Sequence, residues 1–185
     1  MSRCLVTGGA GFIGSHVVSK LLHNNHEVVV IDNESAESNE AFNWYDDYAE
    51  NHIVDIRDFD ACRPLFDGVE YVFHLAARSR IQLAMQNPTE CLEVNYLGTY
   101  NMLECARQVG ARRFVNSSTS SSYGLFNDPP LEETMPTDCL NPYSASKVGA
   151  ETLCHMYYRL HRLRTITLRY FNVYGPRQPL KGQYA

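Results

Sequence analysis

Residues 3–14 read Arg-Cys-Leu-Val-Thr-Gly-Gly-Ala-Gly-Phe-Ile-Gly, and this stretch decides the fold that the sequence predicts. An apolar run from Cys4 to Val6 stops at glycines, and an amphipathic segment from Phe12 to Leu22 follows, which is typical of a strand, a tight turn and a helix. Only glycine enters such a turn at little cost, because it has no side chain to collide when φ becomes positive. The bare backbone also lets a pyrophosphate approach the N–H groups at the positive end of the helix dipole.

The glycine spacing fits two versions of a dinucleotide-binding pattern, Gly9-x-Gly11-x-x-Gly14 and Gly8-x-x-Gly11-x-x-Gly14. A glycine turn by itself can simply join a strand to a helix. Here a second apolar run, residues 27–31, ends in Asp32 at about the separation expected for the acid that binds an adenosine ribose. The sequence therefore predicts a dinucleotide site. The negative charge of Asp32 would repel the additional phosphate of NADP, which favours NAD as the cofactor.

The length of 185 residues suits one α/β domain, and the net charge of -5 gives no reason to expect nucleic acid as a partner. No cationic and apolar leader precedes the first strand, and no apolar run is long enough to cross a bilayer, so we expect a cytoplasmic protein with no membrane partner. The cysteines lack a CxxC pair and nearby histidines at metal-ligand spacing, so we expect buried, reduced thiols and no metal site.

Short apolar runs alternate with amphipathic segments along the rest of the chain. We expect strands at residues 4–6, 28–31, 52–56, 69–75, 113–116 and 165–168. Helices are expected at 12–22, 58–66, 88–109 and 142–161, whereas 33–50, 128–141 and 171–185 read as irregular. The alternation predicts right-handed βαβ units in an α/β fold, with a doubly wound parallel sheet of the Rossmann type and strand order 3-2-1-4-5-6.

Ligands of such a sheet lie beyond the carboxyl ends of its strands. This rule places along one rim the glycine turn, Asp32, Asp55, the turn at Ala76 and Ala77, and the polar run of residues 117–122. We expect the functional site at this rim.

Tyr143 and Lys147 stand four residues apart in a predicted helix, so their side chains share one face. A free tyrosine titrates near ~10, and lowering its pKa by about three units takes roughly 4 kcal/mol. The Lys147 ammonium and an oxidised nicotinamide together are a plausible source of that stabilisation. This spacing also occurs on solvated helices, but after a dinucleotide motif and a Ser/Thr run at a strand end it predicts a catalytic pair.

Several motifs, in the right order along nearly the whole chain, resemble the extended short-chain dehydrogenase/reductase family, specifically its NAD-dependent nucleotide-sugar epimerases and dehydratases. The motifs are Thr7-Gly8-Gly9-Ala10-Gly11-Phe12-Ile13-Gly14, Asp32-Asn33, Asp55-Ile56, His74-Leu75-Ala76-Ala77, Asn95-Tyr96-Leu97-Gly98-Thr99, Ser117-Ser118-Thr119, Tyr123-Gly124, Tyr143-Ser144-Ala145-Ser146-Lys147, Arg169-Tyr170-Phe171-Asn172 and Tyr174-Gly175-Pro176-Arg177.

The resemblance implies a site residue by residue. The cofactor-binding residues that it implies are Gly8, Gly11, Phe12, Ile13, Gly14, Asp32, Asn33, Asp55, Ile56, Leu75, Ala76, Ala77, Asn95, Ser117, Tyr143, Lys147 and Phe171. The catalytic residues would be Thr119, Tyr143 and Lys147, and the nucleotide-sugar substrate would meet Thr119, Ser120, Tyr143, Asn172 and Arg177. Simpler interpretations stay open for three of these residues: Asn95 as a helix surface residue, Phe171 as core packing and Asp55 as a turn or cap.

The residues after Thr119 separate the chemistries that the resemblance allows. Sugar 4,6-dehydratases of the family carry an Asp-Glu pair there, and decarboxylating relatives usually carry a Glu at the second position. This chain has Ser120 and Ser121, which cannot readily replace a carboxylate base at neutral pH. The resemblance therefore implies reversible oxidation at one carbon, with C4 epimerisation of a UDP-hexose through a 4-keto intermediate as the leading interpretation.

Family members continue past the Arg-Tyr-Phe-Asn motif into a substrate-binding lobe, whereas this sequence stops at Ala185. We therefore expect residues 1–185 to be a Rossmann domain in which 171–185 begin a truncated substrate-binding region. Two alternatives stay open: an NAD-binding module without efficient catalysis, and a 4-keto-sugar reductase or dehydratase. The helices at 89–109 and 142–161 resemble those that pair in family dimers, so we expect a homodimer, although their apolar residues could instead all face the sheet.

Overall fold

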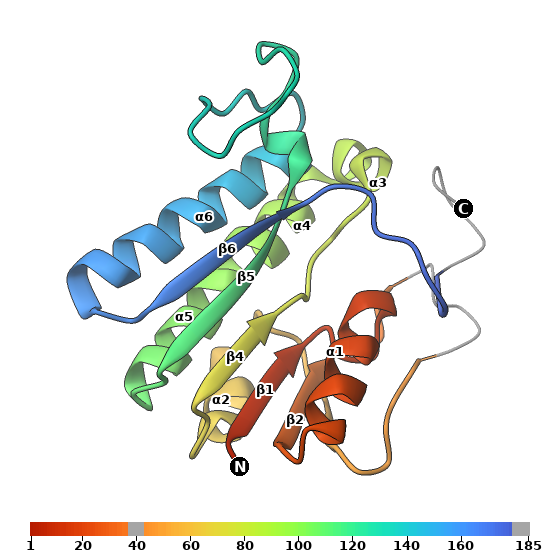
Figure 1. Ribbon diagram of the computed structural model, residues 1–185, viewed down its shortest axis with the longest axis vertical. Coiled ribbons are helices and arrows are strands. Elements are labelled where there is room, and N and C mark those ends of the chain that lie inside the picture. The colour runs from red at the N-terminus through yellow and green to blue at the C-terminus, as the bar shows by residue number, and fades with distance from the viewer. Residues whose placement is uncertain (37–42, 179–185) are drawn as a thin grey trace.

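Six parallel strands form one sheet in the order β3-β2-β1-β4-β5-β6, as the sequence predicts (Figure 1). The computed structural model describes residues 1–36 and 43–178; parts of the expected irregular segments, residues 37–42 and 179–185, lie outside the described residues. The strands are β1 (Arg3–Thr7), β2 (Glu27–Asp32), β3 (Glu50–Ile53), β4 (Tyr71–His74), β5 (Arg113–Thr119) and β6 (Thr165–Tyr170). Neighbouring strands pair in parallel throughout, so their carboxyl ends form one edge.

Helices cover both faces of the sheet because its central strands are apolar on both sides. The helix α1 (Phe12–His23) packs over β1 and β2, where Val6, Val28 and Val30 meet Val18. The opposite face carries Leu5 and is covered by the helical segments α2 (Phe59–Cys62), η2 (Arg63–Phe66), α5 (Thr99–Gln108) and α6 (Pro142–His161). In Figure 1 α1 lies in front of β1 and β2, whereas α5 and α6 lie behind β4, β5 and β6.

The single helix expected at 88–109 is wrong in one respect, because the structure divides it. Its parts are α4 (Pro88–Leu92), the π-helical segment η3 (Glu93–Gly98) and α5. The wider turns of η3 bury Asn95, which is 1% exposed and hydrogen-bonds to two other segments. Such π-helical turns are often found at functional sites. A further short helix, α3 (Ile81–Gln86), was not expected, since six residues are too few for a clear period.

Several strand boundaries differ from the expectation by one to three residues, and two of these differences have a clear structural cause. The third strand was expected at 52–56, but it ends at Ile53 because Asp55 folds the chain into a turn in which its Oδ1 accepts the N–H of Arg57 at 2.9 Å. The fifth strand was expected to end at Asn116, but it continues through Thr119 because residues 117–119 pair with residues 168–170 of β6. The start of α6 is as expected: Pro142 is its first residue, and Asn141 and Ser144 form a capping box around it.

The cysteines are free thiols, as expected; Cys4, Cys62, Cys91, Cys105 and Cys154 are buried, but Cys139 is exposed. Within the part of the chain that the structure describes, no helix is both long and apolar enough to span a membrane.

Candidate functional site

The glycine turn forms a tight bend between β1 and α1 that leaves backbone N–H groups available. Gly8 has φ of +69°, and a Cβ added there would lie 2.7 Å from the backbone nitrogen of Ala76. Gly11 is the N-cap residue of α1, which has no side-chain cap and no acid in its first turn. In the described ranges the N–H groups of Phe12 and Ile13 make no hydrogen bond. Donors without a partner at the positive end of a helix dipole suit an anion, so this bend fits the pyrophosphate of a dinucleotide.

Asp32 ends β2 beside this bend. Its carboxylate accepts the N–H of Ala10 at 3.0 Å and that of Glu34 at 2.9 Å. Burial is the main influence on this carboxyl and raises its pKa, while the two backbone donors oppose the rise. Asp32 therefore lies where the sequence places the acid for an adenosine ribose, and its carboxylate is already oriented by the turn.

Asn33 and Asp55 connect the ends of β2 and β3. The Asn33 amide donates to Asp55 Oδ2 at 2.9 Å, and the Arg57 guanidinium binds the same carboxylate at 2.7 Å. The hydrogen bond from Arg57 is the largest influence on Asp55 and lowers the pKa of its carboxyl to about 2. Asp55 thus has a structural role in a turn. Ile56 beside it is buried at 4% exposure and packs against Gly98.

His74 lies at the end of β4 in a fully buried hydrogen-bond chain. Thr99 donates its hydroxyl hydrogen to the Asn95 carbonyl at 2.6 Å, so its Oγ1 accepts the Nε2–H of His74 at 2.9 Å. The Nδ1 atom of His74 is then an acceptor and receives the hydroxyl of Thr7 at 2.7 Å. His74 is therefore neutral, and it joins the first strand to the segment around Asn95.

The hydroxyl oxygen of Thr7 also holds the turn after β4. It accepts the N–H groups of Leu75 and Ala76, each at 3.2 Å. This places residues 75–77 against the glycine bend, where the sequence expects them. Two turns from different strands are thereby fixed by one threonine.

Burial, with a smaller contribution from the Lys147 charge, lowers the pKa of His74 to about 3, from an ordinary value of 6.5. Below pH 6.5 the unfolded chain takes up a proton that the folded chain refuses, so this group costs stability as the pH falls toward 3. Between pH 6.5 and pH 4.5 we expect the free energy of unfolding to fall in both proteins. The fall should be smaller in His74→Gln than in the wild type by roughly 2 to 3 kcal/mol. Urea unfolding at both pH values measures this, and an equal loss in the two proteins would refute it.

Asn95 was expected near the cofactor, with a helix surface position as the alternative, and the structure buries it. Its amide exchanges two hydrogen bonds with the backbone of Arg78, at 2.8 and 3.0 Å, and donates to Ser146 Oγ at 2.9 Å. Ser146 directly precedes Lys147 on α6. Asn95 therefore fixes the segment after β4 relative to the helix that carries the predicted catalytic pair.

Thr119, Tyr143 and Lys147 meet where β5 ends and α6 begins. The hydroxyls of Thr119 and Tyr143 share a hydrogen bond. Thr119 Oγ1 also accepts the N–H of Ser121 at 3.1 Å, so residues 120–122 turn away from the strand as a short 3-10 helix. Lys147 is only 3% exposed. Tyr143 and Lys147 therefore lie one helical turn apart on α6, with the Thr119 hydroxyl beside the phenol, which suits proton transfer at a substrate hydroxyl.

The direction of the Tyr143 shift differs from the sequence expectation. Burial is the dominant influence and raises the pKa of the phenol, and the hydrogen bond with Thr119 opposes this only in part. Burial also lowers the pKa of Lys147 to about 8. Cys154, Glu151 and Cys91 have the opposite, smaller effect on this pKa. The argument from spacing omitted desolvation, which is the largest influence on the pKa of each of these side chains.

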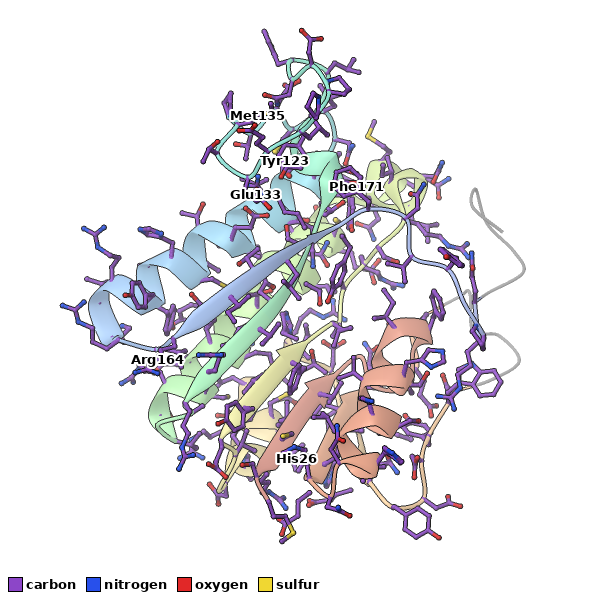
Figure 2. All side chains as sticks on the ribbon, in the orientation of Figure 1. His26, Tyr123, Glu133, Met135, Arg164 and Phe171 are labelled. Atoms are coloured by element: carbon purple, nitrogen blue, oxygen red, sulfur yellow. The ribbon has the colours of Figure 1, made fainter. Side chains whose placement is uncertain are left out.

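Of the expected substrate residues, Ser120 lies beside Thr119, whereas Asn172 and Arg177 lie on the segment that follows β6. Phe171 is not core packing: it is 61% exposed and stacks on Tyr123 with ring centroids 6.3 Å apart, and Figure 2 shows the two side chains close together beyond β5 and β6. The guanidinium of Arg177 lies 5.3 Å from the ring centroid of Trp44.

The segment after β6 also returns to the glycine bend. The carbonyl of Pro176 hydrogen-bonds His16 Nε2 on α1 at 2.8 Å, and the backbone N–H of Trp44 donates to the Ala10 carbonyl at 3.0 Å. His16 and Trp44 were not among the predicted site residues. No sequence pattern points to them, because these contacts join parts of the chain that are far apart in sequence.

Glu151 was also missed, although its spacing could have revealed it. It follows Lys147 by four residues, so Tyr143, Lys147 and Glu151 occupy one face of α6. Its carboxylate pairs with Arg169 of β6 at 2.8 Å and accepts the hydroxyl of Ser118. The side chains of this pair are only 15% and 16% exposed.

Comparisons with known proteins show which family the chain belongs to. Residues 4–184 match the model of the NAD dependent epimerase/dehydratase family. A UDP-glucose 4-epimerase of Mycolicibacterium smegmatis is 37% identical over 98% of this chain and 59% of its own length. UDP-glucuronic acid decarboxylase 6 of Arabidopsis thaliana is 38% identical over 95% and 52%. The crystal structure of a Thermotoga maritima UDP-glucose 4-epimerase with UDP-glucose has a TM-score of 0.92 at 36% identity, over 98% of this chain and 59% of that one.

The chain thus spans less than 60% of the length of each of these proteins. The similarity extends from the glycine turn to the residues beyond β6. The relatives in sequence and the similar structure agree on the same family. The chain belongs to the NAD dependent epimerase/dehydratase family.

Proposed function

We propose that the protein is an NAD-dependent epimerase of a nucleotide sugar, with a UDP-hexose as substrate and C4 as the reacting carbon. The observation that carries this proposal is the meeting of Thr119, Tyr143 and buried Lys147 at the carboxyl edge of a sheet whose first turn fits a pyrophosphate. The serines at positions 120 and 121, in place of carboxylates, favour epimerisation over dehydration.

Residues of this chain would hold the cofactor along that edge. The N–H groups of Phe12 and Ile13 would bind the pyrophosphate, Asp32 the adenosine ribose, and Tyr143 and Lys147 the nicotinamide ribose. The absence of side chains at Gly8, Gly11 and Gly14 would let the pyrophosphate approach the backbone. Residues 75–77 and Asn95 would line the central part of the cofactor site. Ser117 and Phe171 would lie at its nicotinamide end. When bound, NAD would accept the hydride of the sugar and return it.

The protein's own part of the reaction is proton transfer. Ionised Tyr143 would remove the proton of the sugar 4-hydroxyl, while Thr119 hydrogen-bonds that hydroxyl and relays the proton. Because burial raises the pKa of Tyr143, its ionisation depends on positive charge brought close to it. Lys147, one turn further along α6, would supply part of that charge. The 4-keto sugar would then turn over and be reduced on its opposite face.

The test is to purify the chain, measure NAD released on denaturation, and follow UDP-glucose and UDP-galactose interconversion with added NAD. Interconversion without net consumption of cofactor supports the proposal. Bound NAD with no turnover of a broad UDP-sugar panel would instead support an NAD-binding module. Net consumption of NADH with a 4-keto sugar would identify a reductase.

We also propose that the protein forms a homodimer through α4, η3, α5 and α6. Large apolar side chains are exposed along these neighbouring helices: Leu92, Tyr96, Leu97, Tyr100, Met156, Tyr158 and Leu160. They do not all face the sheet, which was the alternative. Exposed apolar side chains on adjacent helices favour self-association.

Leu97→Glu is expected to convert a wild-type dimer to a monomer, because it places a charge in the proposed interface. Light scattering coupled to size exclusion would measure the mass. Leu125→Glu is the matched control, since Leu125 is 84% exposed on a loop away from these helices. A wild-type monomer, or a dimer that Leu97→Glu leaves intact, would count against this interface.

A further inference from the structure

The ion pair between Glu151 and Arg169 lies directly behind the proposed catalytic residues and has no role in the chemistry described so far. Both side chains are largely buried, and the guanidinium makes contacts of 2.8 to 3.2 Å to the two carboxylate oxygens. Burying two charges is costly and seldom stabilises a protein compared with apolar residues of similar size. A pair in this position therefore calls for a functional explanation.

Glu151 connects the two elements that carry the catalytic groups. It lies on α6, one turn beyond Lys147 and two turns beyond Tyr143, so all three share a face. It accepts the hydroxyl of Ser118, the residue before Thr119 on β5. The carboxylate therefore fixes the end of the strand that carries Thr119 to the helix that carries the phenol and the amine.

Arg169 extends the same network toward the substrate side. Its guanidinium lies 4.9 Å from the ring centroid of Tyr123, which in turn stacks on Phe171. Tyr123 is 4% exposed, and Figure 2 shows Tyr123 beside Phe171 at this end of the sheet. Contacts thus run from Glu151 through Arg169 and Tyr123 to the aromatic ring expected near the nicotinamide.

We propose that Glu151 is a positioning residue of the active site: its carboxylate keeps the buried Lys147 charged and, with Ser118 and Arg169, holds Thr119 and Phe171 in register with Tyr143. This inference rests on the proposed function for its catalytic consequence. Its effect on Lys147, however, is a property of the protein alone.

The other groups that face Lys147 cannot replace this carboxylate. From α6 itself, Cys154 acts on Lys147, but burial raises the pKa of that thiol to about 12, so it is uncharged when the amine titrates. Cys91 of α4 is a thiol that contacts Ser146 and Asn95. His74 of β4 is neutral near pH 7 because its pKa is about 3. Glu151, paired with Arg169, is the carboxylate among these neighbours.

Lys147 can be observed directly by NMR, because the lysines of the chain are Lys20, Lys147 and Lys181. Carbon-13 labelling of lysine Cε gives few resonances, and Lys147→Arg assigns the one of interest. In the wild type we expect Lys147 to titrate with a pKa of about 8. In Glu151→Gln we expect the midpoint to move down by about one unit, since a neighbouring negative charge is lost.

Matched variants separate this role from a general loss of structure. Glu104→Gln removes a carboxylate that also binds an arginine, Arg107, and should leave the Lys147 titration unchanged. Glu151→Asp keeps the charge and should restore most of the shift. If Glu151→Gln alone does not fold, because it leaves Arg169 buried without its partner, the double variant Glu151→Gln/Arg169→Met removes the pair together and should shift Lys147 in the same direction.

The pH dependence of turnover gives a second measurement. Loss of the Lys147 charge at a lower pH should move the basic limb of the kcat profile down by the same amount, so turnover at pH 8 relative to pH 6.5 should fall about fivefold in Glu151→Gln. An unchanged Lys147 titration in a folded Glu151→Gln protein would overturn the inference while leaving the proposed function intact. Absence of epimerase activity in the wild type would refute the proposed function, and the NMR titration would still decide the role of Glu151.

Discussion

Tyr143→Phe is expected to lower epimerisation by roughly a thousandfold or more while leaving NAD affinity within a few fold of the wild type. The ring volume is kept, and only the hydroxyl that accepts the sugar proton is lost. The Tyr143 hydroxyl is largely desolvated and hydrogen-bonds Thr119. When the Tyr143 hydroxyl is removed, the Thr119 hydroxyl still has a second hydrogen-bond partner, the N–H of Ser121. A large change in fold is therefore not expected.

The measurements for this variant are UDP-glucose and UDP-galactose interconversion, NAD binding by calorimetry and the thermal midpoint. Tyr48→Phe is a matched control, because Tyr48 is 90% exposed and belongs to neither the proposed site nor the proposed dimer interface. It should retain wild-type turnover. Turnover of Tyr143→Phe close to that of the wild type would show that another group takes the proton.

Gly14→Ala is expected to abolish detectable NAD binding and to destabilise the protein by several kcal/mol. A Cβ at position 14 would lie 2.0 Å from the carbonyl oxygen of Gly8 and 2.8 Å from its carbon. Both atoms belong to the backbone of the bend, so the clash cannot be relieved by a side-chain rotation. The turn must open, and the N–H groups of Phe12 and Ile13 would then no longer point together at the pyrophosphate.

Gly11→Ala provides a graded comparison at the same turn. A Cβ at position 11 would lie 3.3 Å from the Gly8 oxygen, a contact that a small shift relieves. We expect its thermal midpoint to fall much less than that of Gly14→Ala. Differential scanning fluorimetry and NAD calorimetry on both variants test the order, and wild-type NAD affinity in Gly14→Ala would contradict the role of the bend.

The fold follows from local sequence signals that are strong in this chain. The apolar runs of β1 and β2, the glycines between β1 and α1, and the proline and capping box that begin α6 each restrict the backbone within a few residues. Right-handed crossovers then leave few ways to order the strands. The predicted strand order is confirmed for this reason. The ends of β3 and β5 were wrong where segments distant in sequence meet: the Asn33 side chain binds Asp55, and the backbone of residues 117–119 pairs with β6.

The candidate site was predictable only where its residues are close together in sequence. Spacing identified Tyr143 with Lys147, and the glycine bend with Asp32, because a helical turn or a strand and turn places each set together. Spacing could not give the protonation of these groups. Burial raises the pKa of Tyr143 and lowers that of Lys147, and burial depends on which helices and strands pack around them.

The sequence by itself determined the α/β architecture, the strand order and the rim on which the predicted functional residues lie, since backbone restriction and apolar periodicity act over short distances along the chain. Only the tertiary structure decided that neutral His74 joins β1 to the segment around Asn95, that Asn95 turns inward from a π-helical segment, and that Glu151 and Arg169 form a buried pair behind Lys147. Desolvation and hydrogen bonding between distant segments set the charges of the site, and these forces exist only once the chain has folded.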